Sequence, residues 1–585
     1  SADIKLFPFL SFKSSLGLDI SRTSDESFLP KYYLNGTDQV TNAKVGRGVG
    51  QRDYWVFENY LSYNDKFGDH TVSTMVGTSA EKERYETVNA SKEGLVNNDA
   101  NQQIINAATK NPAASGSVSY HTMNSYFGRV FYSYADKYMI TANIRWDGSS
   151  NFADKHRWGV FPSVSGGWNF REESFIKDVV GDWFSQGKFR AAWGEIGNQN
   201  ISSGAYLTRY GNSTYYLLGN SMTPWLSGGR TNVGNPDLRW ETTRQLDFGL
   251  DLAFFNSALK FNIDYFDRKT SDMLVQVPMP AAIGLPNTPW SNAGSVKNRG
   301  FEFVLDYHGK IGNDFSYNFA GNISTYKNKV LSLGGGTNIP GKTHLGNQVN
   351  TMIEPGKPIG YFYGYKMDGV FQTQEEINNY RGGPDNTIIM PTAEPGDLKF
   401  VDLNGDGKLG EEDRTMIGNP HPDFTFGLTL SGEYKGFDLS MFFQGSVGND
   451  ILNILKYDIY SGTGWYNAPK DIFDKFWTGP GSTNENFAIS ANSRDNLTMS
   501  EWYIENGSYV RLKNVTLGYT FPKQWVQKLT VQNLRLFVAA QNLFTITSYS
   551  GLDPELGNSN PAFMGIDMGW YPQARSFMVG LSLKL

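Results

Sequence analysis

The sequence predicts an all-β fold, a transmembrane antiparallel β-barrel of about 16 strands with long extracellular loops. Three observations predict it. Apolar and polar residues alternate along the chain, many alternating segments exceed ten residues where globular strands average about 5 to 6, and very short turns alternate with long connections. We expect residues 1–585 to form one barrel domain.

The alternation is clearest on either side of a turn at Asn256-Ser257. The apolar residues there stand at every second position, namely Leu246, Phe248, Leu250, Leu252 and Phe254, then Leu259, Phe261, Ile263 and Tyr265. Asp, Gly, Lys and Asn are frequent between them. Because successive side chains of a strand point to opposite faces, each segment has one apolar and one polar face. Lipid on one side and a wet interior on the other require this pattern.

The expected strands and connections follow from the same pattern. The strands are expected at 11–22, 52–64, 68–84, 117–135, 137–149, 157–171, 185–197, 240–256, 258–271, 295–310, 312–327, 422–434, 436–448, 505–521, 531–543 and 574–585. The long loops are expected at 23–51, 85–116, 198–239, 272–294, 328–421, 449–504 and 544–573. Short turns at one end and long loops at the other are typical of the bacterial outer membrane, with the long loops outside the cell.

Composition agrees with a membrane surface. Aromatic residues make up 15% of the chain, as 39 Phe, 32 Tyr and 14 Trp, and Tyr and Trp are enriched where an apolar medium meets water. Residues such as Tyr138 and Trp146 are placed to form an aromatic girdle. The formal charge is −6 with no basic block, so the charge pattern gives no indication of nucleic-acid binding.

One segment has the spacing of a calcium-binding loop. Residues 402–413, within the expected loop 328–421, fit D-x-[DN]-x-[DN]-G-x5-E except that Asp stands at the last position. The expected ligands of a structural Ca²⁺ are Asp402, Asn404, Asp406, the backbone carbonyl of Lys408, and Asp413. The alternative is a loop of Asx-turns that holds no ion.

No catalytic arrangement stands out, and we expect no enzyme activity. The six His residues lack ligand spacing, and no G-x-S-x-G elbow is present. Aromatic residues of the long loops could stack on sugar rings or simply pack the loops together; they are Trp225, Trp290, Trp465 and Tyr466.

Several sequence blocks resemble the SusC/RagA family of TonB-dependent transporters. They occur in family order along nearly the whole chain and include Arg145–Phe152, Lys188–Gln199, Asn235–Glu241, Gly356–Tyr365, Tyr509–Pro522 and Phe537–Phe544. The resemblance implies a 22-stranded outer-membrane barrel with a plugged lumen. About six strands and the plug have no counterpart among the segments found here, so a fragment, a split transporter or a true 16-stranded porin are all open.

The resemblance also implies a function. It implies TonB-dependent import of oligosaccharides or peptides, a SusD-like lipoprotein over the long loops, and a TonB–ExbB–ExbD complex that acts through the plug. A dimer of transporter–lipoprotein pairs is a further implication. The alternatives are a passive outer-membrane porin and a surface receptor or adhesive β-protein.

Overall fold

The computed structural model describes residues 1–218, 223–276, 288–334, 338–342, 348–460, 467–489, 495–526, 531–558 and 560–584. These residues form two compact units. Unit 1 comprises Ser1–Gly167, Ala192–Arg244 and Asp272–Ala293, and unit 2 comprises Trp168–Ala191, Gln245–Ser271 and Gly294–Leu585. Within the described part of the chain, every helix is too short or too polar to cross a membrane.

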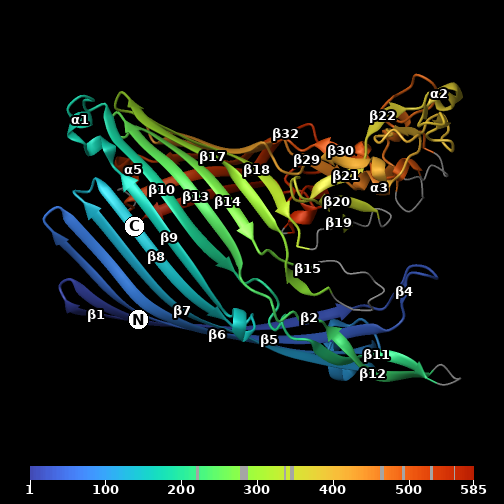
Figure 1. Cartoon of the computed structure of the whole chain (residues 1–585), viewed down its shortest axis with the longest axis horizontal. Coiled ribbons are helices and arrows are strands. Elements are labelled where there is room, and N and C mark those ends of the chain that lie inside the picture. Colours follow the sequence, from blue (N-terminus) through green and yellow to red (C-terminus); the bar gives the residue numbers. More distant parts are fainter. Residues whose placement is uncertain are drawn as a thin grey trace. The chain divides into compact units, whose positions relative to one another are not determined.

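Unit 1 is an antiparallel meander whose neighbouring strands follow each other in the chain (Figure 1). Its long strands are β1 (Ala2–Phe7), β2 (Leu10–Leu29), β5 (Ala43–Phe67), β6 (His70–Leu95), β7 (Lys110–Tyr134), β8 (Tyr138–Ser149) and β9 (Trp158–Trp168). Three small hairpins complete it: β3 (Tyr32–Tyr33) with β4 (Gln39–Val40), β11 (Arg209–Leu218) with β12 (Thr223–Asn232), and β15 (Leu274–Gln276) with β16 (Trp290–Asn292).

Unit 2 contains a second antiparallel meander. Its strands are β14 (Leu259–Ser271), β17 (Ser295–Ile311), β18 (Phe315–Ser332), β27 (Phe424–Tyr434), β28 (Phe437–Val447), β31 (Tyr509–Thr520), β32 (Asn533–Thr547) and β34 (Ser576–Lys584). The residues of β10 (Phe184–Asn198) and β13 (Glu241–Phe254) are divided between the two units.

The loops of unit 2 carry their own small elements. The strands are β19 (Ile339–Lys342), β20 (Val349–Ile353), β21 (Tyr361–Tyr365), β22 (Met367–Val370), β23 (Arg381–Gly382), β24 (Thr387–Ile388), β25 (Leu398–Phe400), β26 (Arg414–Gly418), β29 (Asp450–Asn453), β30 (Ile504–Asn506) and β33 (Ile566–Asp567). The helices are α1 (Ser174–Lys177), α2 (Gln374–Asn379), α3 (Leu455–Tyr460), α4 (Ile472–Lys475) and α5 (Lys523–Val526).

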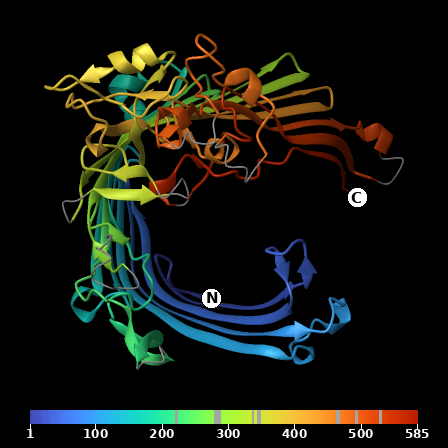
Figure 2. The ribbon, with the colours of Figure 1, turned by 90° about the vertical axis from the view of Figure 1, so that its right-hand side faces the viewer.

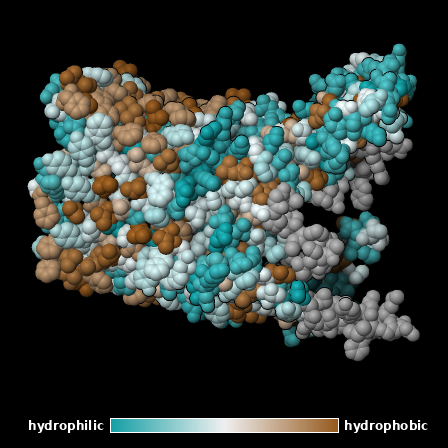
Figure 3. All heavy atoms as spheres, in the orientation of Figure 1, coloured by the Kyte–Doolittle hydropathy of each residue, from teal (hydrophilic) through white to brown (hydrophobic). Residues whose placement is uncertain are grey.

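The loops of unit 2 share a hydrophobic core with fully buried Phe371, Phe400, Phe487 and Tyr503. Figure 2 shows these yellow and orange segments folded against one another. The loops of unit 2 therefore pack together around one core and are not separate, independently exposed loops. In Figure 3 its surface around α2 and β22 is hydrophilic, whereas apolar surface covers the strands near α1.

Each expected strand has a counterpart, and β1 is an additional one that pairs with β2. The expected extents of two loops, 23–51 and 85–116, were wrong. β2 continues to Leu29 and β5 already begins at Ala43, while β6 continues to Leu95 and β7 begins at Lys110. These outer parts lack an apolar face because neither side meets hydrocarbon, so period-2 alternation does not reveal them.

Two aromatic belts mark the membrane band in unit 1. Tyr134 stacks on Tyr138 near the short β7–β8 turn, with ring centroids 6.5 Å apart. Tyr126, Trp146 and Trp158 form the other belt, with centroids 5.1–6.0 Å apart. The eight steps from Tyr138 to Trp146 span roughly 27 Å along a strand, or about 21 Å along the membrane normal at a tilt near 40°, which fits an apolar band of ~25 Å.

Candidate functional site

The strands of unit 2 present a polar face on the side opposite to their apolar residues. Arg190 from β10 donates hydrogen bonds to Asp251 at 2.8 Å and to Asp264 at 2.8 Å, and Asn262 donates to Asp251 at 2.7 Å. Further along the meander, Arg535 donates to Asp438 at 2.9 Å. These charged side chains pair with one another and also remain accessible to water. The face therefore suits contact with polar solutes.

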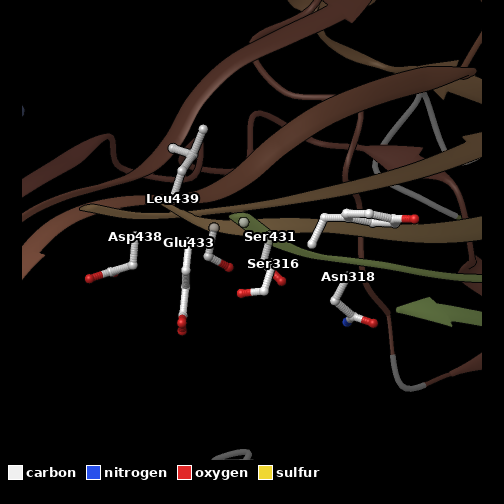
Figure 4. Close-up of a pocket in the computed structure, with 9 residues that line it drawn as sticks. Ser316, Asn318, Ser431, Glu433, Asp438 and Leu439 are labelled. Atoms are coloured by element: carbon white, nitrogen blue, oxygen red, sulfur yellow. The ribbon is translucent and has the colours of Figure 1, made fainter. Parts of the chain in front are cut away.

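A shallow pocket of about 260 Å³ lies on this polar face where β18, β27 and β28 meet. Figure 4 shows the polar side chains pointing to one side of the sheet and Leu439 pointing to the other; they are Ser316, Asn318, Ser431, Glu433 and Asp438. The alternation expected from the sequence is thus realised side chain by side chain. The pocket offers hydroxyl, amide and carboxylate groups and could hold a polar ligand.

An ion-paired cluster fixes the last long loop to this sheet. Arg511 of β31 has a side chain only 4% exposed and pairs with Asp553 and Glu555, both at 2.5 Å. Lys513 also pairs with Glu555 at 2.8 Å. Burial alone would raise the pKa of Asp553, but the hydrogen bonds from Arg511 and from the backbone hold this pKa below its usual range. The loop is therefore anchored by buried, charge-assisted hydrogen bonds.

The expected calcium loop folds into successive Asx-turns. Asp402 accepts the N–H groups of Gly405 and Gly407 at 2.7 and 2.8 Å, and Asn404 accepts that of Asp406 at 2.8 Å. Gly407 has a φ of +84°, which suits the glycine at position 6 of such a loop. Asp406 accepts the N–H of Lys408 at 2.9 Å.

Asp413 closes this loop from its final position. It is fully buried, and its carboxylate accepts the backbone N–H groups of Leu403, Asn404 and Gly410 at 2.8 to 3.2 Å. The described residues contain no group of three or more His, Cys, Asp or Glu side chains gathered around a metal position. An EF-hand loop also uses amide and backbone oxygens, so the calcium assignment stays a prediction.

The aromatic candidates of the long loops have different surroundings. Trp290, in β16, is half-buried and packs against a core that contains Phe152, Leu238 and Trp240. Trp225 lies in β12, where its backbone pairs with Tyr216. Trp465 and Tyr466 lie outside the described residues. A sugar-binding role for these four residues stays a prediction, and the packing of Trp290 fits the structural alternative.

Two exposed aromatic residues were missed by sequence reasoning. Trp570 and Tyr571 are 52% and 90% exposed next to β33. The sequence signal was a Trp-Tyr pair flanked by turn-forming residues, because Gly569 precedes the pair and Pro572 follows it. Such turn residues favour an exposed loop tip, where large rings have few packing partners.

Comparisons with known proteins agree with this fold. The family described as TonB dependent receptor-like, beta-barrel, matches residues 3–543. The chain is 34% identical over 599 residues to the TonB-dependent receptor P3 of Formosa agariphila, covering 98% of this chain and 56% of that protein. It is 30% identical over 591 residues to the TonB-dependent receptor SusC of Bacteroides thetaiotaomicron, covering 99% and 54%. The chain thus spans about half the length of the curated relatives it matches.

Solved structures show the same likeness. The chain superposes on a structure of the RagAB peptide transporter with a TM-score of 0.83 at 22% sequence identity, over 99% of this chain and 60% of that chain. A RagAB peptide importer in its 'open-open' state gives a TM-score of 0.81. At this level of identity the likeness concerns the fold alone.

Proposed function

The chain belongs to the TonB dependent receptor-like β-barrel family of the outer membrane, and on that premise we propose that it forms the barrel of an active importer of oligosaccharides. Peptides are the alternative cargo. The relatives are described as receptors and transporters, which supports transport and not catalysis.

The polar face of the unit 2 strands is the observation that carries this proposal. Its paired charges, such as Arg190 with Asp251, and the pocket beside Glu433 give a hydrogen-bonding surface for a hydrated solute. We further propose that Trp225, Trp290, Trp465 and Tyr466 contribute aromatic contacts to sugar rings, together with Tyr571.

The proposed transport requires partners. A plug in the lumen would link the barrel to TonB, ExbB and ExbD, which supply energy from the inner membrane. A SusD-like lipoprotein would cover the long loops and pass cargo to the barrel, and two such pairs could form a dimer. The family membership supports these partners, and the resemblance to SusC is the basis for the lipoprotein.

Uptake by whole cells tests the proposal. We expect deletion of the gene to abolish uptake of at least one labelled oligosaccharide, and the intact gene to restore it. A protonophore should stop uptake in the complemented strain, because active import depends on the inner-membrane gradient. Uptake that continues unchanged with the protonophore would indicate a passive porin, and unchanged growth of the deletion strain on every glycan and peptide tried would contradict import.

We also propose that the 402–413 loop binds Ca²⁺ in a structural role. The motif spacing and the φ of Gly407 support it. Lys408 would contribute its backbone carbonyl and Asp413 a carboxylate. A bound ion would neutralise these carboxylates and hold the loop rigid against the rest of the loop core.

Hydrogen exchange with and without Ca²⁺ tests this proposal. We expect Ca²⁺ to slow amide exchange in 402–413, with about 2.7 kcal/mol of stabilisation at a concentration a hundred times the dissociation constant. Asp402→Asn should weaken the calcium effect by about tenfold or more. Glu412→Gln, an exposed neighbour outside the expected ligand set, is the matched control. Identical exchange in Ca²⁺ and in chelator would show that the Asx-turns alone hold the loop.

A further inference from the structure

The apolar face of β14, β17 and β18 ends in a cluster of cations. Residues directly opposite each other in two successive rows are Asp267, Arg299 and Lys327, then Lys269, Lys297 and Lys329. Their pairing is regular down to the apolar residues, so they share the face that carries Phe261, Phe303 and Ile323. We name these six residues the basic rim. It has five cations and one carboxylate in a chain whose formal charge is −6.

The basic rim is only partly neutralised. Lys297 pairs with Asp267 at 2.7 Å. Arg299, Lys327 and Lys329 are exposed, and among the described residues none of them forms an ion pair. Like charges that face each other across strands are destabilising, and here three lysines stand in one row. A bound anion would reduce this repulsion between the cations of the basic rim.

An apolar groove lies on the same face of the same strands, continuous with the membrane band. It has a volume of about 450 Å³ and is lined by Phe261, Phe303, Leu305, Phe319, Ile323, Phe426 and Leu428 around Gly321. A Cβ placed on Gly321 would meet its nearest atoms only at 3.7 to 3.9 Å. The missing side chain of Gly321 therefore leaves a gap between Leu305 and Leu428, which flank it in the same row.

The groove lies at the depth of the outer leaflet of the membrane. Phe315 marks one edge of the apolar band, and the row of Tyr265, Phe301 and Thr325 marks the other. Gly321 lies six residues from Phe315 and four from Thr325, so it is in the outer half of the band. The six steps from Gly321 to Lys327 correspond to about 15 Å along the membrane normal, half the thickness of a hydrocarbon core.

We propose that this face binds an anionic, phosphorylated lipid of the outer leaflet. Its headgroup phosphate is held by Arg299, Lys327 and Lys329, and one acyl chain fills the groove over Gly321. Arginine and lysine match phosphate by charge and by hydrogen bonding, and only hydrocarbon fits an apolar groove within the band. A lipid satisfies both parts with one molecule, because its headgroup and chain end are separated by the distance between rim and groove.

Native mass spectrometry of the protein purified from outer membranes tests the proposal. The probes are phosphatidylglycerol and phosphatidylcholine with identical acyl chains, and inorganic phosphate as competitor. We expect Arg299→Gln with Lys327→Gln to weaken phosphatidylglycerol binding by roughly tenfold or more, with little effect on phosphatidylcholine. Gly321→Phe should weaken both lipids, because it fills the groove.

The controls repeat each change elsewhere. Lys260→Gln with Lys310→Gln removes two charges from the polar face of β14 and β17. Gly128→Phe enlarges a glycine on the apolar face of β7, away from the groove. Both control variants should leave lipid binding unchanged. If Gly321→Phe fails to fold, Gly321→Leu repeats the groove test. Rim and control variants with equal lipid affinity would overturn the proposal. Full displacement of phosphatidylglycerol by inorganic phosphate would also overturn it, because the site would then recognise phosphate without lipid.

Discussion

His421 has a hydrogen-bonding role that its sequence context does not reveal. It is buried just before β27, where its Nε2 lies 3.0 Å from the carbonyl oxygen of Ile359 and its Nδ1 lies 3.2 Å from the hydroxyl of Tyr326. These contacts fit a neutral ring that donates from Nε2 and accepts at Nδ1. Burial lowers the pKa of His421, and the hydrogen bond to Ile359 opposes this shift only in part.

The lowered pKa makes the region around His421 sensitive to acid. In the unfolded chain the imidazole titrates near ~6.5, and the folded state binds the proton less readily. The stability from the neutral ring is therefore present above that pH and is lost as the pH falls toward the lower folded pKa. Histidine hydrogen–deuterium exchange should give His421 a titration midpoint below that of an unfolded peptide.

A variant separates this effect from general acid sensitivity. His421→Gln keeps a donor for the Ile359 carbonyl but does not titrate. It should remove the loss of amide protection around Ile359, measured relative to intrinsic exchange, that the wild type shows as the pH falls below about 6.5. If amide protection around Ile359 depended on pH in His421→Gln as it does in the wild type, groups other than His421 would be responsible.

Sequence reasoning at the residue scale identified spacing but not surroundings. Residues 402–413 could be found because a calcium loop has a fixed order of oxygen donors and one glycine. The complete burial of Asp413 could not be found, because it depends on how several loops pack. Arg511 is a similar case: its partners Asp553 and Glu555 lie more than 40 residues away in the chain.

At the scale of elements, the loop core of unit 2 carries the stability of its region. Trp502 is 5% exposed, and its ring centroid lies 4.9 Å from that of Phe487 and 4.9 Å from that of Tyr503. Its indole N–H donates to Asn486 at 3.0 Å. The strands depend on ladder hydrogen bonds instead, so the two regions should respond differently to a core substitution.

We expect Trp502→Ala to destabilise the loop core by about 3–5 kcal/mol while the strands stay folded. Limited proteolysis should then cut within 366–503 many times faster than in the wild type, and the barrel strands should remain protected. Phe473→Ala is the matched control because Phe473 is 83% exposed and truncating its ring leaves no cavity. Equal cleavage rates for both variants would mean that Trp502 does not support this core.

Sequence reasoning predicted elements well only within the membrane band. Strands such as β8 and β28 were placed within one or two residues, because lipid requires an apolar side chain at every second position. Outside the band this requirement ends, so the outer halves of β5, β6 and β7 have no alternating pattern that distinguishes them from loops. The core around Phe371 was also missed, since short strands from distant segments build it and no single segment shows its pattern.

At the scale of the whole molecule, the two faces of the strands divide the chemistry. The apolar face meets lipid and ends in the basic rim of Arg299 and its neighbours, whereas the polar face holds paired charges such as Arg535 with Asp438. The membrane location follows from the apolar face and from family membership.

The length of β7 sets a standoff distance for anything that rests on its tip. From Tyr126, in the outer aromatic belt, to Lys110 the strand advances 16 residues, which is about 40 Å above the bilayer at a tilt near 40°. A lipid-anchored protein whose first folded element lies at the height of that tip must bridge the distance to the bilayer with its own tether. Since an extended chain covers at most ~3.6 Å per residue, the tether needs roughly 12 residues between the acylated end and the first folded element.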